Sequence, residues 1–116
     1  MSETPFIVPD VAVYSGDVLE FPPYEVWDEN DVPINYSTWT GWAAKWRVTS
    51  DAASSITLSV NSSEANVGVF QISATDIQTP NMQPSGVWDL SGIDSNGKPR
   101  TLFRGRTTWI LDVTRA

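Results

Sequence analysis

The segment TWTGWAAKWRV, residues 38–48, is the clearest indicator of the fold of this chain. Side chains of a β-strand alternate between its two faces. Alternation predicts one face with Trp42, Ala44, Trp46 and Val48, and an opposite face with Trp39, Ala43, Lys45 and Arg47. Because the second face ends in two charged residues, we expect the first to face the core. A buried Trp46 and an exposed Trp39 follow from this register.

Short alternating segments separated by Pro, Gly and polar turns continue on both sides. Further strands are predicted at 11–14, 18–27, 56–60, 67–74, 87–93 and 99–115. Trp88 is expected to point inward. Pro22 and Pro23 cannot donate a backbone hydrogen bond, and the apolar parity changes across them, which predicts a bulge. Gly105 likewise suggests a bulge, and Gly92 is interpreted as a turn glycine.

The last strand has a polar outer face and is entered through a predicted hairpin. Asn96-Gly97 is a strong short-hairpin signal. Beyond it, one face is expected to hold Thr107, Trp109, Leu111 and Val113, and the other Arg104, Arg106, Thr108 and Asp112. Seven short strands in one chain of 116 residues predict a single all-β domain over 1–116, an antiparallel two-sheet sandwich with a short N-terminal arm at about 1–10.

The composition excludes several classes of chemistry. The chain has no cysteine and no histidine, so disulfides, thiolate nucleophiles and the usual zinc sites are excluded. Its formal net charge of −7 makes nucleic acid an unfavourable partner. No apolar run reaches the roughly 18 residues of a membrane span, and the first residues lack the pattern of a signal peptide. We therefore expect a protein made in a cytoplasm, with no membrane partner.

No catalytic or metal-binding constellation is recognisable. Asp89 and Asp112 are the acids inside the late predicted strands, and both alternate outward. The segment DENDVP, residues 28–33, is rich in acids but lacks the glycine and the distant glutamate of a calcium loop, so a turn is predicted. We expect a protein that is not an enzyme and that needs no cofactor and no metal.

Tryptophan content and charge distribution point to contacts with other chains. Six tryptophans are more than one small core accommodates fully, and tryptophan is enriched at interfaces. Residues 1–44 carry acids but no Lys or Arg, whereas the last strand is basic. Candidate interface residues are Trp27, Asp28, Glu29, Trp39, Arg104 and Arg106. Two interpretations stay open: complementary faces that join copies into a homo-oligomeric ring, or solvated charges paired within one domain.

The order of the motifs resembles a known family. The matching positions are Gly16, Asp17 and Arg47, then 76–79, Gly86, Trp88 and Asp89, and finally Gly97, Lys98, Thr101, Leu102, Gly105, Asp112, Val113 and Thr114. This pattern is similar to the small immunoglobulin-like domain of tailed phages, found in baseplate upper proteins and in collar or tail-fibre-attachment proteins of siphophages. One departure is the family's Asp-x-x-Gly turn, which reads Asp28-Glu29-Asn30-Asp31 here; another is INYSTWTG in place of DLTG.

The resemblance implies a function without catalysis. It implies an immunoglobulin-like sandwich that serves as a virion structural protein, present in several copies. Such a protein would be an adaptor or ring subunit at the tail, collar or neck, with other tail, collar or fibre proteins as partners. A capsid decoration protein and a carbohydrate- or surface-binding module that uses exposed Trp side chains are the alternatives.

Overall fold

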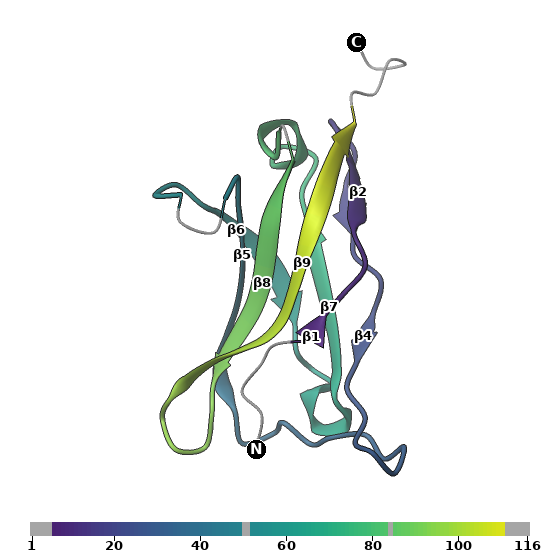
Figure 1. The fold of residues 1–116 in the computed structure, drawn as a ribbon, viewed down its shortest axis with the longest axis vertical. Helices are drawn as coiled ribbons and strands as arrows, with labels where there is room; N and C mark the ends of the chain where they lie inside the picture. Colours follow the sequence, from purple (N-terminus) through teal and green to yellow (C-terminus); the bar gives the residue numbers. More distant parts are fainter. Residues whose placement is uncertain (1–5, 50–51, 84, 111–116) are drawn as a thin grey trace.

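The chain is all-β (Figure 1). The computed structural model describes residues 6–49, 52–83 and 85–110. The strands are β1 (Phe6–Ile7), β2 (Val11–Tyr14), β3 (Leu19–Glu20), β4 (Tyr24–Glu25), β5 (Thr40–Arg47), β6 (Ile56–Asn61), β7 (Val69–Ala74), β8 (Ser85–Ile93) and β9 (Pro99–Ile110). Two single 3-10 turns, η1 (Ala65–Val67) and η2 (Thr79–Asn81), are the helical elements of the described residues.

One continuous sheet curls into a half-barrel with two layers, like a β-sandwich. Its strand order is β1-β9-β8-β5-β6-β7-β3, with β2 also on β9 and β4 also on β7. Strand β6 joins the layers, because its first half pairs with β5 and its second half with β7. The front layer is therefore β2-β9-β8-β5, and the back layer is β6-β7 with β3 and β4. Strands β1 and β2 run parallel to β9, and the other pairs are antiparallel.

The predicted strands are all present, with two differences in count. The predicted 18–27 strand is split at Pro22-Pro23 into β3 and β4. Three residues, 21–23, lie opposite two residues of β7, 71–72, which confirms the predicted bulge. The additional strand is β1, because the described part of the expected N-terminal arm lies along β9. Residues 111–116, including Leu111, Asp112 and Val113, lie outside the described residues.

The core lies between the two layers and is rich in aromatic rings. Trp46 and Trp88 are buried, at 3 % and 1 % exposure, as predicted. The Trp88 ring packs edge-on against Phe21, with ring centroids 4.9 Å apart, and so links the front layer to the back layer. Val48 was expected on the core face but is 46 % exposed, because β5 ends at Arg47 and the alternation does not extend beyond it.

Glycines of the front layer give room to the large indoles. A Cβ atom on Gly86 would lie 2.5 Å from the ring of Trp46, and one on Gly92 would lie 2.9 Å from Trp42. A Cβ atom on Gly105 would lie 2.7 Å from the Trp88 Nε1 atom. The pairing of β8 and β9 also shows that two expectations about these glycines are wrong. Gly92 lies inside β8 rather than in a turn, and Gly105 pairs in register with Trp88 rather than forming a bulge.

The bulge of β9 lies four residues from the turn that precedes the strand. Leu90 pairs with Phe103, but the next residue of β8, Ser91, pairs with Thr101, which leaves Leu102 as the extra residue. Both Leu102 and Phe103 are buried. The bulge thus brings two consecutive apolar side chains into the core and restores the alternation that turns Arg104 and Arg106 outward.

Two buried threonines satisfy backbone and indole donors between distant segments. Trp46 Nε1 donates to Thr107 Oγ1 at 2.8 Å, and the Gly86 amide donates to the same oxygen at 3.1 Å. Thr79 Oγ1 accepts from the Gly16 amide at 3.0 Å and donates to the Asp17 carbonyl at 2.9 Å. These bonds tie together segments that are far apart in the sequence.

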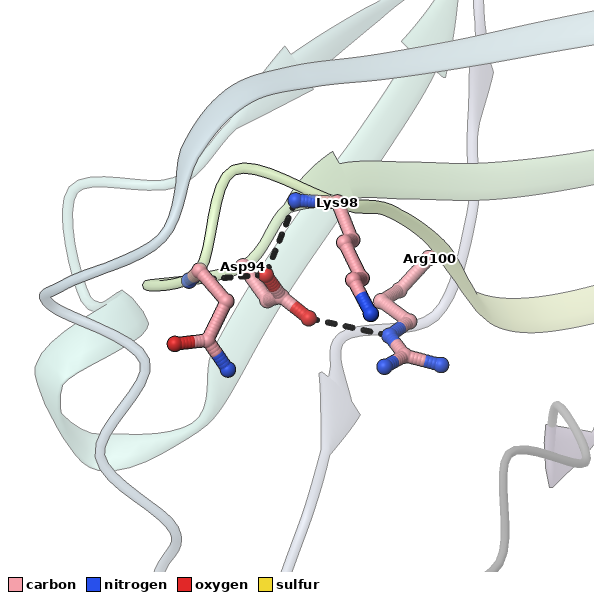
Figure 2. Close-up of polar contacts among 4 residues, drawn as sticks. Asp94, Lys98 and Arg100 are labelled. Atoms are coloured by element: carbon pink, nitrogen blue, oxygen red, sulfur yellow. Dashed lines mark hydrogen bonds and ion pairs between the residues drawn. The ribbon is translucent and has the colours of Figure 1, made fainter.

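The predicted hairpin at Asn96-Gly97 is confirmed and is closed by Asp94 (Figure 2). Asp94 Oδ1 accepts from the amides of Asn96 and Lys98, at 2.9 and 3.0 Å, and Asp94 Oδ2 pairs with Arg100 at 2.9 Å. Gly97 takes φ +76°, so the loop is a turn followed by a left-handed residue rather than a two-residue hairpin.

The predicted turn at 28–33 is also confirmed, and it repeats the same design. Asp28 Oδ1 accepts from the amides of Asn30 and Val32, at 2.8 and 3.0 Å. Asp31 takes φ +60°, which is the place of Gly97 in the hairpin and of glycine in the Asp-x-x-Gly turn. The departure from that pattern therefore places a non-glycine residue in the left-handed region.

Candidate functional site: a basic hollow on the outer sheet face

Strand pairing gathers charged residues on the outer face of the front layer. Two cross-strand rows run over β5, β8 and β9: Lys45, Asp89 and Arg104 in one, and Arg47, Val87 and Arg106 in the next. Within each strand, the residues just before and just after these positions face the core. The outer face therefore carries four cations and one carboxylate within two adjacent rows.

The N-terminal segment turns this face into a hollow of about 590 Å³. Ile7, Val8 and Asp10 form its wall beside β9. The Val8 amide donates to the Arg104 carbonyl at 3.0 Å, which holds this wall against the strand. We refer to this site as the basic hollow. Its volume falls in the range of about 300–1,000 Å³ that is usual for ligand pockets.

Asp89 lies half-buried in the middle of the cations. Burial raises the pKa of its carboxyl group, while the neighbouring charges of Arg104, Arg47 and Lys45 lower it, and the net direction is upward. Among the described residues, no ion pair within 4.0 Å joins Arg104 or Arg106 to a carboxylate. Both side chains are exposed. The guanidinium groups are thus available to an external carboxylate, and arginine is well suited to bind one through two parallel hydrogen bonds.

The acidic residues of the first third lie elsewhere on the surface. Five exposed carboxylates follow one another along β3, β4 and the turn after β4: Glu20, Glu25, Asp28, Glu29 and Asp31. We refer to them as the acidic ridge. Glu20 and Glu25 point outward from the back layer, because Leu19 and Tyr24 beside them are buried. The two layers face each other with their inner sides, so these two glutamates and the basic hollow lie on opposite sides of the domain.

The turn at 28–33 lies at one end of the domain (Figure 1), and Trp27 directly precedes it. Trp27 is 49 % exposed and forms an isolated bridge with Pro33. Asp28 and Glu29 are both exposed, and Asp28 also accepts a hydrogen bond within its own turn. The six predicted interface residues therefore do not form one surface. Arg104 and Arg106 belong to the basic hollow, and Asp28 and Glu29 belong to the acidic ridge.

Trp39 is placed differently from the prediction. It was expected on the face opposite Trp42, but the two indoles stack, with centroids 5.6 Å apart and planes 13° apart. Trp39 is half-buried and packs against the rim of the core. The alternation fails because Gly41 takes φ +64° and the register of β5 shifts between Thr40 and Ala43. A glycine inside a strand pattern signals such a break.

Sequence reasoning missed Lys45, Arg47 and Asp89 as parts of one site. Alternation placed each of them outward, as observed. Their convergence depends on β8 lying between β5 and β9, and strand order is not encoded in the alternation of a single segment. The described residues contain no group of three or more His, Cys, Asp or Glu arranged to hold a metal ion. No helix in the part of the chain that the structure describes is long and apolar enough to cross a membrane.

Comparisons with known proteins relate the chain to other structures through its fold. No protein-family model matches, and no curated protein matches by sequence. Similar solved structures include the SrpA adhesin from Streptococcus sanguinis, with a TM-score of 0.54 and 13 % identity, and a mutant of the same adhesin, with a TM-score of 0.52 and 12 % identity. Each match covers 100 % of this chain but 62 % and 61 % of the adhesin chains, so this domain spans about three-fifths of their length. At this identity the likeness concerns the fold alone.

Proposed function

We propose that this protein is a non-enzymatic structural subunit of a tailed-phage virion, present in several copies. It would act as an adaptor or ring subunit at the tail, collar or neck. The observation that carries the proposal is the basic hollow on one side of the domain, with acidic residues of the ridge on the opposite side. Two unlike faces on opposite sides of a domain permit head-to-tail contacts between copies, and such contacts close into rings when the rotation allows.

The resemblance to the phage family supports the proposal through residues with structural roles. Gly16 and Asp17 are held by Thr79, Gly86 makes room for Trp46, and Gly97 forms the left-handed position of the hairpin. The shared pattern therefore marks the turns and close contacts of this particular sandwich. Of the charged residues that line the basic hollow, the pattern includes Arg47 and Asp89 but not Lys45, Arg104 or Arg106.

The contact that we propose joins the basic hollow of one copy to the acidic ridge of the next. Carboxylates such as Glu20 and Glu25 would replace solvent around Arg104 and Arg106. The chain has a net charge of −7, so copies repel each other at long range, and the contact depends on this local match. Charge pairs at the rim of an interface are screened by salt. Assembly is therefore expected to weaken as the salt concentration rises.

Light scattering on purified protein tests the contact through single charge reversals. Arg106→Glu and Lys98→Glu change the net charge equally, but Lys98 lies in the hairpin and outside the basic hollow. We expect Arg106→Glu to abolish self-association and Lys98→Glu to leave it intact. Glu25→Arg combined with Arg106→Glu should partly restore it. Self-association of Arg106→Glu at the wild-type level would contradict the electrostatic contact.

Imaging of virions tests the structural role separately. An antibody fragment against this chain should label a ring at the tail, collar or neck of purified particles. Labelling spread over the head would instead identify a capsid decoration protein. Absence of the chain from purified particles, measured by mass spectrometry, would contradict the virion role.

A further inference from the structure

A second hollow, of about 370 Å³, lies where the segment before β5 meets the turn after β6. Its lining residues come from the segment before β5, the start of β5 and the turn with η1, and Figure 1 shows the start of β5 and this turn at the same end of the domain. None of its lining residues is charged: Tyr36, Ser37, Trp39, Trp42, Ser62, Ser63, Ala65 and Asn66. It shares no lining residue with the basic hollow. We refer to it as the aromatic hollow.

Its aromatic side chains form a fixed platform. Trp42 lies against the backbone of Gly92, where a Cβ atom would approach its ring to 2.9 Å, and its ring centroid is 4.5 Å from that of Phe70. Trp39 stacks on Trp42 at 5.6 Å. Tyr36 packs edge-on against both indoles, at interplanar angles of 82° and 86°. The platform is therefore ordered before any ligand arrives, which lowers the entropic cost of binding.

Polar groups surround the platform and have no partner within the described chain. The side chains of Ser37, Ser62, Ser63 and Asn66 make no hydrogen bond to any described residue. The backbone beneath two of them is fixed, because the Ser37 amide donates to Asn35 Oδ1 at 2.8 Å and the Ser63 amide donates to Asn61 Oδ1 at 3.0 Å. The hydroxyl groups of Ser37 and Ser63 therefore project from a held backbone, and all four side chains are free to bind a ligand.

The indole N–H groups give an independent indication. Trp46 and Trp109 donate their indole hydrogens to Thr107 and to the Thr79 carbonyl. Within the described residues, Trp39 and Trp42 donate theirs to no acceptor, and neither belongs to the buried atoms that lack a partner. These two donors therefore keep some exposure to solvent, and both indoles line the hollow. An aromatic platform with a few convergent neutral donors and acceptors is typical of a small-molecule site.

We propose that the aromatic hollow binds one pyranose ring of a neutral polysaccharide. A pyranose has an apolar C–H face that packs on an indole and hydroxyl groups around its edge that bond to serine and asparagine. The absence of charged lining residues selects a neutral sugar, because a sugar carboxylate would lose hydration without gaining a cation. This site does not depend on the basic hollow or on assembly, and it would give an assembled particle a contact with a carbohydrate surface.

Nuclear magnetic resonance of the intact chain tests the proposal, because each of the six tryptophans carries one indole N–H group whose signal can be followed. The probes are the methyl glycosides of glucose, galactose, mannose and N-acetylglucosamine, added into the high millimolar range, with methyl glucuronide as a charged control. We expect at least one neutral glycoside to shift the signals of Trp39 and Trp42. Trp109, whose indole is bonded to Thr79, should not respond.

Variants separate binding from folding. Asn66→Ala changes an exposed side chain and should keep the fold, yet weaken binding several-fold. Trp39→Ala should weaken it at least tenfold, and Trp27→Ala, a matched tryptophan outside the hollow, should leave it unchanged. Three results would overturn the proposal: no shift with any neutral glycoside, shifts of wild-type size in Asn66→Ala and Trp39→Ala, or equal binding of methyl glucuronide.

Discussion

Replacing Thr107 with valine should destabilise the sandwich far more than its change in shape suggests. The two side chains have nearly the same volume, but valine has no acceptor. Thr107 is buried, with 2 % of its surface exposed. Its Oγ1 atom accepts hydrogen bonds from two buried donors, the Trp46 indole and the Gly86 amide. Each buried donor left without a partner costs about 1–3 kcal/mol. We therefore expect a loss of about 2–6 kcal/mol in the free energy of unfolding, a large part of the ~5–15 kcal/mol that is usual for a domain.

Urea denaturation followed by tryptophan fluorescence measures this loss directly. Thr108→Val is the matched control, because Thr108 neighbours Thr107 on β9 but points to solvent. The control should stay within about 0.5 kcal/mol of wild type, as surface substitutions usually do. The slope of the transition should be unchanged in both variants, so the difference appears in the midpoint. A Thr107→Val midpoint equal to that of the control would refute the role assigned to this oxygen.

Three further changes have defined directions. Burial raises the pKa of the Asp89 carboxyl above its unfolded value, so its contribution to stability is present at acidic pH and is lost as pH rises through the folded pKa. Asp89→Asn should therefore raise the melting temperature at pH 7 and not in strong acid; an equal gain at both pH values would contradict the assignment. Burial raises the pKa of Tyr24 to about 12, so the unfolded chain releases this proton first, and stability should fall from pH 10 to 12; Tyr24→Phe should reduce that fall in alkaline melts. Asp31→Gly should stabilise the turn by up to ~1 kcal/mol, because φ +60° suits glycine; a lower melting temperature would count against strain at this position.

Alternation along single segments was sufficient to predict the inner faces of the strands. It placed Trp46 and Trp88 in the core and Arg104 and Arg106 outside, and it detected the parity change at Pro22-Pro23. It failed where the backbone leaves the regular strand. Gly41 interrupts β5, so Trp39 and Trp42 meet on one side, and β5 ends before Val48. Periodicity describes residues within a strand and carries no information on where the strand ends.

The candidate site could be predicted only in part, because it depends on strand order. Lys45, Asp89 and Arg104 are each outward by alternation, but they are far apart in the sequence and become neighbours through two pairings. The wall of the basic hollow was also missed. The segment from Phe6 to Asp10 looked like a free arm, since two residues of parallel pairing on β9 leave no recognisable period in the sequence.

The arrangement of the basic hollow explains how four cations share one sheet face. Neighbouring strands are about 4.8 Å apart, and like charges placed directly opposite each other destabilise a sheet. In both rows the cations stand on β5 and β9, and β8 separates them by a residue that is not basic, Asp89 in one row and Val87 in the other. The cations of a row are therefore about two strand spacings apart, roughly 10 Å, a distance at which salt screens much of their repulsion. The inner positions of these strands hold the apolar core residues, including indoles packed on glycines, so core packing does not require any particular residue in the outer rows. The charge pattern of the outer face can thus vary, while the fold is maintained from the other side of the same strands.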